Sequence, residues 1–197
     1  MRRLVAAALL LLAWPSSARA NGQGILAGFG GVSLDSQTGF LDLEQTVGKP
    51  KLIFGASIGR VWDMCGWEVD LSAAPGFFAG NAEPKLLFGS QVSVLTANAL
   101  FFAPRRLTGS RFRPYAVAGG GLLKARIDDI YGLFPSNTWL KGIDVGGGLF
   151  VFGQNRYGLR FDARYIRSTH APDPLGFGFS DIFVNYWRTA AGVTYRF

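Results

Sequence analysis

The chain ends, from Trp187 to Phe197, in the sequence WRTAAGVTYRF. Counting back in twos from Phe197 gives only apolar, aromatic or small residues, whereas the positions between them include Arg188, Thr194 and Arg196. A two-residue period is typical of a β-strand whose two faces meet different environments. The segment therefore predicts a final strand with one apolar face that carries aromatic residues near both ends.

The beginning of the chain has the three parts of a secretory signal peptide. Two arginines at positions 2 and 3 precede an apolar run that extends from Leu4 to Trp14, and a small-x-small ending closes at Ala20. Eleven apolar residues are too few to cross a hydrocarbon core about 30 Å thick as a helix. We therefore expect residues 1–20 to be a cleaved signal peptide and residues 21–197 to form one exported domain.

The composition argues against several classes of function. After cleavage the chain would carry 17 basic and 13 acidic residues, which are interspersed, so nucleic-acid binding is not expected. One cysteine, Cys65, and one histidine, His170, make a disulfide or a metal site improbable, and we expect no metal or other cofactor. The 27 glycines and the 14% aromatic content suit a small β-barrel.

Eight segments alternate, or nearly so, and turn-forming residues separate them. In the clearest of them, Tyr157, Leu159 and Phe161 fall on one face and the intervening residues are glycine or charged. The parity of Val92 and Val94 conflicts with the rest of their segment, which predicts a β-bulge near Val94. We place the strands at residues 24–33, 51–62, 65–78, 89–103, 112–125, 139–152, 157–168 and 182–197.

The connections between these segments alternate in length. Those at 63–64, 104–111 and 153–156 are short, whereas those at 34–50, 79–88, 126–138 and 169–181 are mostly longer. Short turns at one end and long loops at the other are typical of outer-membrane barrels, with the turns in the periplasm and the loops outside. The sequence therefore predicts an all-β fold, an eight-stranded antiparallel up-and-down transmembrane β-barrel.

Alternation alone does not say which face is inside, and a soluble lipocalin-like barrel would show the same period. Two features favour a membrane barrel. The polar faces are rich in Gly, Ala and Ser, as a narrow interior requires. The apolar faces carry aromatic residues near the strand ends, where they would form girdles at the membrane interfaces: Trp62, Trp67, Phe101, Tyr115, Trp139, Tyr157, Tyr165 and Trp187.

Five short motifs carry a resemblance to a known family: Arg113-Pro114-Tyr115, Ala118–Gly121, Gly146–Leu149, Leu159–Tyr165 and Val193–Phe197. Together they resemble the OmpA-like group of eight-stranded outer-membrane barrels. The resemblance implies location in the outer membrane and a C-terminal signal, at Val193, Tyr195 and Phe197, that the barrel assembly machinery reads. The peptidoglycan-binding domain of longer relatives has no counterpart here, so cell-wall tethering is not expected.

If the polar faces point inward, the interior collects charged side chains that must pair, because an unpaired buried charge costs several kcal/mol. We predict an ion-pair network that closes the lumen. An alternative is a narrow gated channel whose ion pairs exchange to admit ions or small solutes. The residues of the predicted network are Glu68, Asp70, Lys124, Asp144, Arg160, Asp162, Arg164, Arg188 and Arg196.

The function that these features favour is a monomeric, non-enzymatic barrel with a structural or surface-interaction role. Its expected partners are outer-membrane lipids, lipopolysaccharide and an extracellular partner bound through loops 126–138 and 169–181, the second of which contains Phe177 and Phe179. A third hypothesis is a lipid A-modifying hydrolase that uses Ser168 and His170. In the deacylases that this stretch loosely resembles, the histidine precedes the serine, whereas here it follows, so we expect no catalysis.

Overall fold

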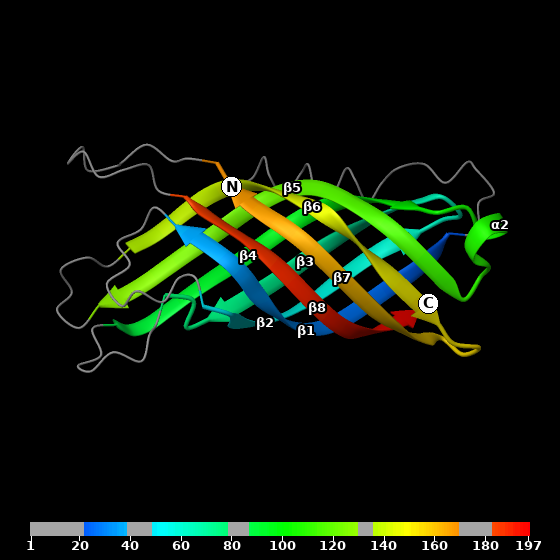
Figure 1. The fold of residues 1–197 in the computed structure, drawn as a ribbon, viewed down its shortest axis with the longest axis horizontal. Helices are drawn as coiled ribbons and strands as arrows, with labels where there is room; N and C mark the ends of the chain where they lie inside the picture. The colour runs from blue at the N-terminus through cyan, green and yellow to red at the C-terminus, as the bar shows by residue number, and fades with distance from the viewer. Residues whose placement is uncertain (1–21, 39–48, 79–86, 130–135, 170–182) are drawn as a thin grey trace.

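The computed structural model describes residues 22–38, 49–78, 87–129, 136–169 and 183–197. Over these residues the chain forms a closed barrel of eight antiparallel strands (Figure 1), in which each strand pairs with its neighbours in sequence and the last pairs with the first. The predicted fold class is confirmed. The strands are β1 (Gln23–Thr38), β2 (Lys51–Val61), β3 (Cys65–Pro75), β4 (Leu87–Phe102), β5 (Phe112–Asp129), β6 (Ser136–Phe152), β7 (Tyr157–Ser168) and β8 (Val184–Arg196).

The seam between β1 and β8 closes the barrel. Gly24 and Phe197 exchange two backbone hydrogen bonds of 2.9 and 3.0 Å, so the final residue takes part in closure. Towards the other end of the seam the register shifts between Leu34 and Gln37, where Asp35 has a φ of +48°. This is the geometry of a β-bulge, which lets β1 bend as it leaves the ladder.

The three short connections lie at one end of the barrel, together with the C-terminus (Figure 1). The connection between β4 and β5 contains one helical turn, α2 (Arg105–Thr108), which the sequence did not predict. The turn ends at Gly109, whose φ of +74° is accessible to glycine at little cost and whose N–H donates to the carbonyl of Arg105.

Four strands are longer than predicted at the opposite end. β1 continues to Thr38, β4 begins at Leu87, β5 continues to Asp129 and β6 begins at Ser136, so the expected loop sequence at 34–38, 87–88, 126–129 and 136–138 is strand. Most of the other predicted loop residues, at 39–48, 79–86, 130–135 and 170–181, lie outside the described residues, as do the predicted signal peptide and residue 182, the predicted start of the last strand.

The predicted bulge near Val94 is wrong. β4 keeps an unbroken register with β3 from Gln91 to Phe101, and its one irregularity, against β5, lies between Leu87 and Gly89. Val92 and Val94 are both buried in the interior. Their parity conflicts with the expected polar lumen because this end of the interior is apolar.

The outer wall is covered by large apolar side chains that remain exposed, among them Leu52, Phe54, Leu71 and Phe161. An exposed apolar surface of this extent is unfavourable in water and suits contact with acyl chains. Within the described part of the chain, no helix is long and apolar enough to cross a membrane.

Glycine lets the narrow wall curve at positions where strands approach closely. A Cβ built on Gly121, which points inward from β5, would overlap the carbonyl oxygen of Leu95 and lie 2.7 Å from the Cα of Thr96. A Cβ built on Gly28, which points outward from β1, meets no atom within 4 Å.

We expect Gly121→Ala to destabilise the barrel by about 2 kcal/mol, because the clash is with backbone and needs a shift of β4. Gly28→Ala is the matched control and should leave stability almost unchanged. Urea unfolding of the refolded variants in detergent micelles measures both. Equal stability of the two variants would contradict the close approach of β4 and β5.

Candidate functional site in the barrel interior

The interior of the barrel contains a layer of charged side chains at mid-height. Three arginines, two of them on β7 and one on β8, face four carboxylates from β3, β6 and β7, and every one of these seven residues is buried. The alternation of each strand brings them inward. The residues of this central layer are Glu68, Asp70, Asp144, Arg160, Asp162, Arg164 and Arg188.

Arg160 is held on three sides. Its guanidinium donates to both carboxylate oxygens of Glu68, at 2.8 and 3.1 Å, and to the Ser57 hydroxyl at 2.8 Å. Its Nε donates to the Tyr115 hydroxyl and lies 3.0 Å from the Asp162 carboxylate. A fork of this kind, with two parallel hydrogen bonds, fixes both partners in one geometry.

Arg164 lies at the centre of the layer. Its guanidinium is 2.5 Å from Glu68, 3.0 Å from Asp144, 3.3 Å from Asp162 and 3.8 Å from Asp70. These carboxylates come from three different strands, so a single side chain links β3, β6 and β7 across the lumen. The charge of Arg164 is compensated from every side.

Arg188 completes the layer from β8. It donates to both oxygens of Asp70, at 2.8 and 3.0 Å, and to the Ser72 hydroxyl at 3.1 Å. Its guanidinium also lies 4.7 Å from the centre of the Phe29 ring, a cation–π contact. β8 is thereby tied to β3, which lies on the far side of the barrel.

Asp144 also binds uncharged polar side chains from β4. The amide of Asn98 donates to the Asp144 carboxylate at 3.2 Å and to the Thr96 hydroxyl at 3.0 Å. Each of the four carboxylates in the layer contacts at least one guanidinium. No set of three or more His, Cys, Asp or Glu side chains in the described ranges is arranged to hold a metal ion.

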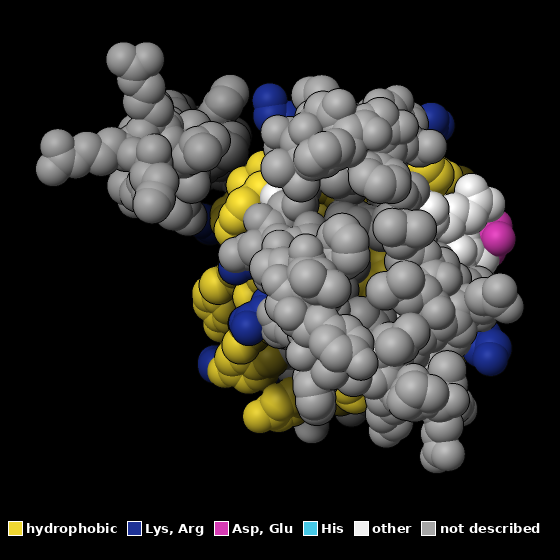
Figure 2. All heavy atoms as spheres, turned by 90° about the vertical axis from the view of Figure 1, so that its left-hand side faces the viewer, with side chains coloured by type: hydrophobic (Ala, Val, Ile, Leu, Met, Phe, Trp, Pro, Cys, Tyr) yellow, Lys and Arg dark blue, Asp and Glu magenta, His cyan; other side chains and the backbone are white. Residues whose placement is uncertain are grey.

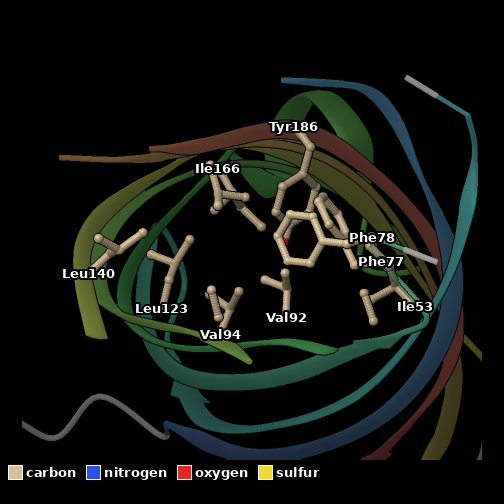
Figure 3. Packing of buried hydrophobic residues seen from close by; sticks show 12 residues of the cluster. Ile53, Phe77, Phe78, Val92, Val94, Leu123, Leu140, Ile166 and Tyr186 are labelled. Atoms are coloured by element: carbon tan, nitrogen blue, oxygen red, sulfur yellow. The ribbon is translucent and has the colours of Figure 1, made fainter. Parts of the chain in front are cut away.

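Two apolar clusters enclose this layer. The loop-end cluster fills the interior above it, and Figure 3 shows its side chains converging from several strands, with Phe77 and Tyr186 in ring contact at 5.5 Å. It consists of Ile53, Ala74, Phe77, Phe78, Val92, Val94, Leu123, Ala125, Leu140, Ile166, Val184 and Tyr186. The turn-end cluster fills the interior below the layer and consists of Ile25, Val61, Leu100, Phe102, Tyr115, Val117, Phe150 and Phe152.

Two of the nine predicted network residues, Lys124 and Arg196, lie outside the central layer. The prediction was wrong for Lys124: its neighbours Leu123 and Ala125 point inward, and its ammonium lies outside the barrel, 5.3 Å from the centre of the Trp139 ring. Arg196 lies at the turn end and donates to the backbone carbonyls of Gly153 and Asn155 rather than to a carboxylate.

The sequence also misplaced one aromatic residue. Tyr115 was expected on the outer wall, but it is buried inside, where it packs on Phe150 at 4.9 Å between ring centres and accepts from Arg160. On β5 the outward positions near Tyr115 are Ala116 and Ala118, so the usual contrast between large outside and small inside is reversed.

The other outward aromatic residues fall into two rows. Trp139, Tyr165 and Trp187 lie towards the loop end, and Tyr165 contacts Trp187 with ring centres 5.3 Å apart. Tyr157 and Tyr195 contact each other at the turn end, with ring centres 5.4 Å apart. Phe101, Trp67 and Trp62 lie at the same end of the barrel, on or next to β4, β3 and β2. Eight residues separate Tyr157 from Tyr165, which is about 26 Å along a strand and about 20 Å along the axis at a tilt near 40°.

In the part of the chain that the structure describes, the Ser168 hydroxyl is bound to backbone. The residue is buried at the end of β7, and its hydroxyl oxygen accepts a 2.7 Å hydrogen bond from the N–H of Val184. This contact fixes the start of β8 against β7. His170, the residue predicted as its base in the hydrolase hypothesis, lies outside the described residues.

No protein-family model matches the sequence, and no curated protein matches it. Several solved structures match the barrel over almost the whole length of both chains. The N-terminal β-barrel domain of OprF from Pseudomonas aeruginosa matches with a TM-score of 0.52 and 14% identity, over 90% of this chain and 98% of that one. The fold is that of the eight-stranded outer-membrane barrels.

Two further structures have the same fold. Ail, the attachment invasion locus protein of Yersinia pestis, solved in complex with the heparin analogue sucrose octasulfate, matches with a TM-score of 0.52 and 17% identity, over 89% of this chain and 98% of that one. The outer-membrane protein OprG from Pseudomonas aeruginosa matches with a TM-score of 0.50 and 18% identity, over 90% and 96%. An outer-membrane barrel fold with an exposed apolar wall places the chain in the outer membrane.

We expect Glu68→Gln to lower the free energy of unfolding by about 3 kcal/mol, because Arg160 and Arg164 then lose their shared buried counter-charge. Asp63→Asn is the matched control. The Asp63–Arg105 ion pair is as short, at 2.7 Å, but both side chains are about half exposed or more, so its loss should cost about 0.5 kcal/mol or less. Urea titration in detergent micelles compares the two, and similar losses would contradict the central role of the buried layer.

Proposed function

We propose that the protein is an integral outer-membrane barrel with a sealed interior, which serves a structural or surface-interaction role and catalyses no reaction. The single observation that carries this proposal is the stacking of three layers inside the barrel. Charged side chains fill the middle, and an apolar cluster lies on each side of them; at the turn end the buried Arg113 also packs on Phe102 and donates to the backbone carbonyls of Trp62 and Asp63. An ion would therefore meet side chains at each level.

The energetics of the three layers support a closed state. An ion entering through either end would pass buried aromatic rings, such as Tyr186 at the loop end or Phe150 at the turn end, without water to solvate it. At mid-height it would compete with arginine–carboxylate pairs that already satisfy each other. An eight-stranded barrel has room for side chains in its interior and little else.

The outer wall supports membrane anchoring. We assign the two rows of aromatic residues to the two membrane interfaces, because amphipathic rings favour the headgroup level and the rows are separated by about the height of an apolar band. In β8, Val193 and Phe197 point outward and are more than half exposed. This exposure is consistent with a C-terminal signal that the assembly machinery reads before the barrel closes.

A surface role would use the loop end. Of the loop segments predicted to bind an extracellular partner, 126–129 and 136–138 are strand, and most of the remainder lies outside the described residues. β5 and β6 therefore extend past the interior layers and would carry their connecting segment away from the membrane. Ail, whose fold is similar, was solved with a heparin analogue, which makes an anionic glycan a reasonable class of extracellular partner to test.

A gated channel is the second candidate, and one observation favours it. Arg164 lies within 4 Å of four carboxylates, so it has alternative partners at hand if one pair breaks. An exchange of partners could open the central layer. Opening the whole lumen would also require the two apolar clusters to move, and for this reason we prefer the sealed barrel.

We expect refolded wild-type protein in planar lipid bilayers to give no stepwise conductance, and Glu68→Gln and Arg164→Gln to remain silent as well, because the apolar clusters still block both ends. The comparison is the double variant Tyr186→Ala/Phe150→Ala, which removes one aromatic ring from each apolar cluster. This variant should pass more ionic current than either charge variant. Discrete channel openings in wild type or in Glu68→Gln alone would support the gated channel instead.

A further inference from the structure

Three basic side chains gather on the outside of the barrel near its loop end. Lys124 on β5, Lys141 on β6 and Arg167 on β7 all occupy outward positions, since their neighbours Leu123, Leu140 and Ile166 point inward and are buried. Figure 2, which looks at this end, shows Lys and Arg side chains among hydrophobic ones at the rim. We call Lys124, Lys141 and Arg167 the basic rim.

The strand register brings these residues together. Lys124 lies opposite Trp139, and Lys141 is the next outward residue after Trp139. Arg167 lies opposite Ile143, the outward residue that follows Lys141. Residues related in this diagonal way on adjacent strands have side chains about 7 Å apart, so the three positive charges form one patch.

The basic rim lies at the level of an interfacial aromatic row. The ammonium of Lys124 is 5.3 Å from the centre of the Trp139 ring, and Arg167 lies two residues beyond Tyr165 towards the loop end. Lysine and arginine stems lie along apolar surface while their charges reach polar headgroups. In the membrane orientation proposed above, the basic rim is at the height of the phosphate groups of the outward-facing leaflet.

Among the side chains that the structure describes on β5, β6 and β7, no Asp or Glu points outward beside the rim, because Asp144 and Asp162 are both buried in the central layer. The side chains of Asp128 and Asp129, at the loop end of β5, lie outside the described ones. A patch of basic side chains at the membrane surface attracts anionic headgroups.

We propose that the basic rim is a binding site for the phosphate groups of a phosphorylated outer-leaflet glycolipid, the lipid A part of lipopolysaccharide. The site rests on the membrane orientation given under Proposed function. A lipid fits better than a free anion, because exposed Trp139 and Ile143 lie between the charges and offer apolar surface to acyl chains. Arginine and lysine would hold phosphate oxygens by charge-assisted hydrogen bonds.

The test uses the full protein refolded in zwitterionic detergent and titrated with purified bis-phosphorylated lipid A, with bound lipid counted by native mass spectrometry. The triple variant K124Q/K141Q/R167Q should bind about tenfold to a hundredfold more weakly than wild type. The matched control R60Q/R106Q/R156Q removes three exposed charges at the turn end and should bind like wild type. Folding of each variant is checked first by its heat-dependent shift in gel mobility, which tests the barrel separately from the site.

If the triple variant fails to fold, K141Q and R167Q alone replace it, since both residues are exposed, and each should weaken binding severalfold. The charge-retaining variant K124R/K141R/R167K should bind like wild type. Unchanged binding by the folded triple variant, equal loss in the turn-end control, or equal binding of dephosphorylated lipid A would each overturn the proposal. Displacement of lipid A by millimolar inorganic phosphate, or tighter binding of sucrose octasulfate than of lipid A, would overturn the choice of a lipid as the ligand.

Discussion

The contact on which the interior depends is that of Arg164 with the carboxylates around it. A guanidinium cannot lose its charge in a protein, so once it is buried the fold must supply negative partners. Glu68, Asp144 and Asp162 supply them from three strands that the chain brings together only when the barrel is closed. The charged layer is therefore satisfied in one register of the strands, and a shift by one residue would turn these side chains outwards.

The narrowness of the barrel makes this arrangement possible. Glycines such as Gly121 point inward where neighbouring backbone leaves no room for a Cβ. Across so narrow a lumen an arginine such as Arg188 reaches a carboxylate on a distant strand. The apolar clusters at both ends exclude water from the layer, which strengthens the ion pairs and raises the cost of breaking them. The narrow lumen thus both seals the interior and selects one register of the strands.

The sequence predicted the strands well because most have one face that is consistently apolar and one that is polar or small. β7 is the clearest example, and its predicted limits, 157–168, agree with the structure. The central charges Glu68 and Arg160 could be predicted from the same alternation, because a charge between apolar neighbours in a membrane strand has only the interior to occupy.

The two ends of the interior could not be predicted in this way. Where the lumen is filled by apolar side chains, both faces of a strand are apolar and the contrast disappears, as at Val92, Val94 and Leu123. Lys124 and Tyr115 were misassigned for this reason: the rule that polar faces point inward fails near the ends of β5. Which arginine meets which carboxylate depends on the register across the barrel, and no local pattern in the sequence carries that information.

The seam between β1 and β8 has a consequence for how the barrel forms. Gly24 and Phe197 are hydrogen-bonded partners although almost the whole described chain lies between them. Joining such distant segments costs chain entropy before any contact repays it, and proteins dominated by distant pairings fold slowly. Until the seam closes, β1 and β8 each present an unpaired edge that could pair with other chains. A partner that shields these two edges during insertion would therefore act on the slowest and most aggregation-prone stage of assembly.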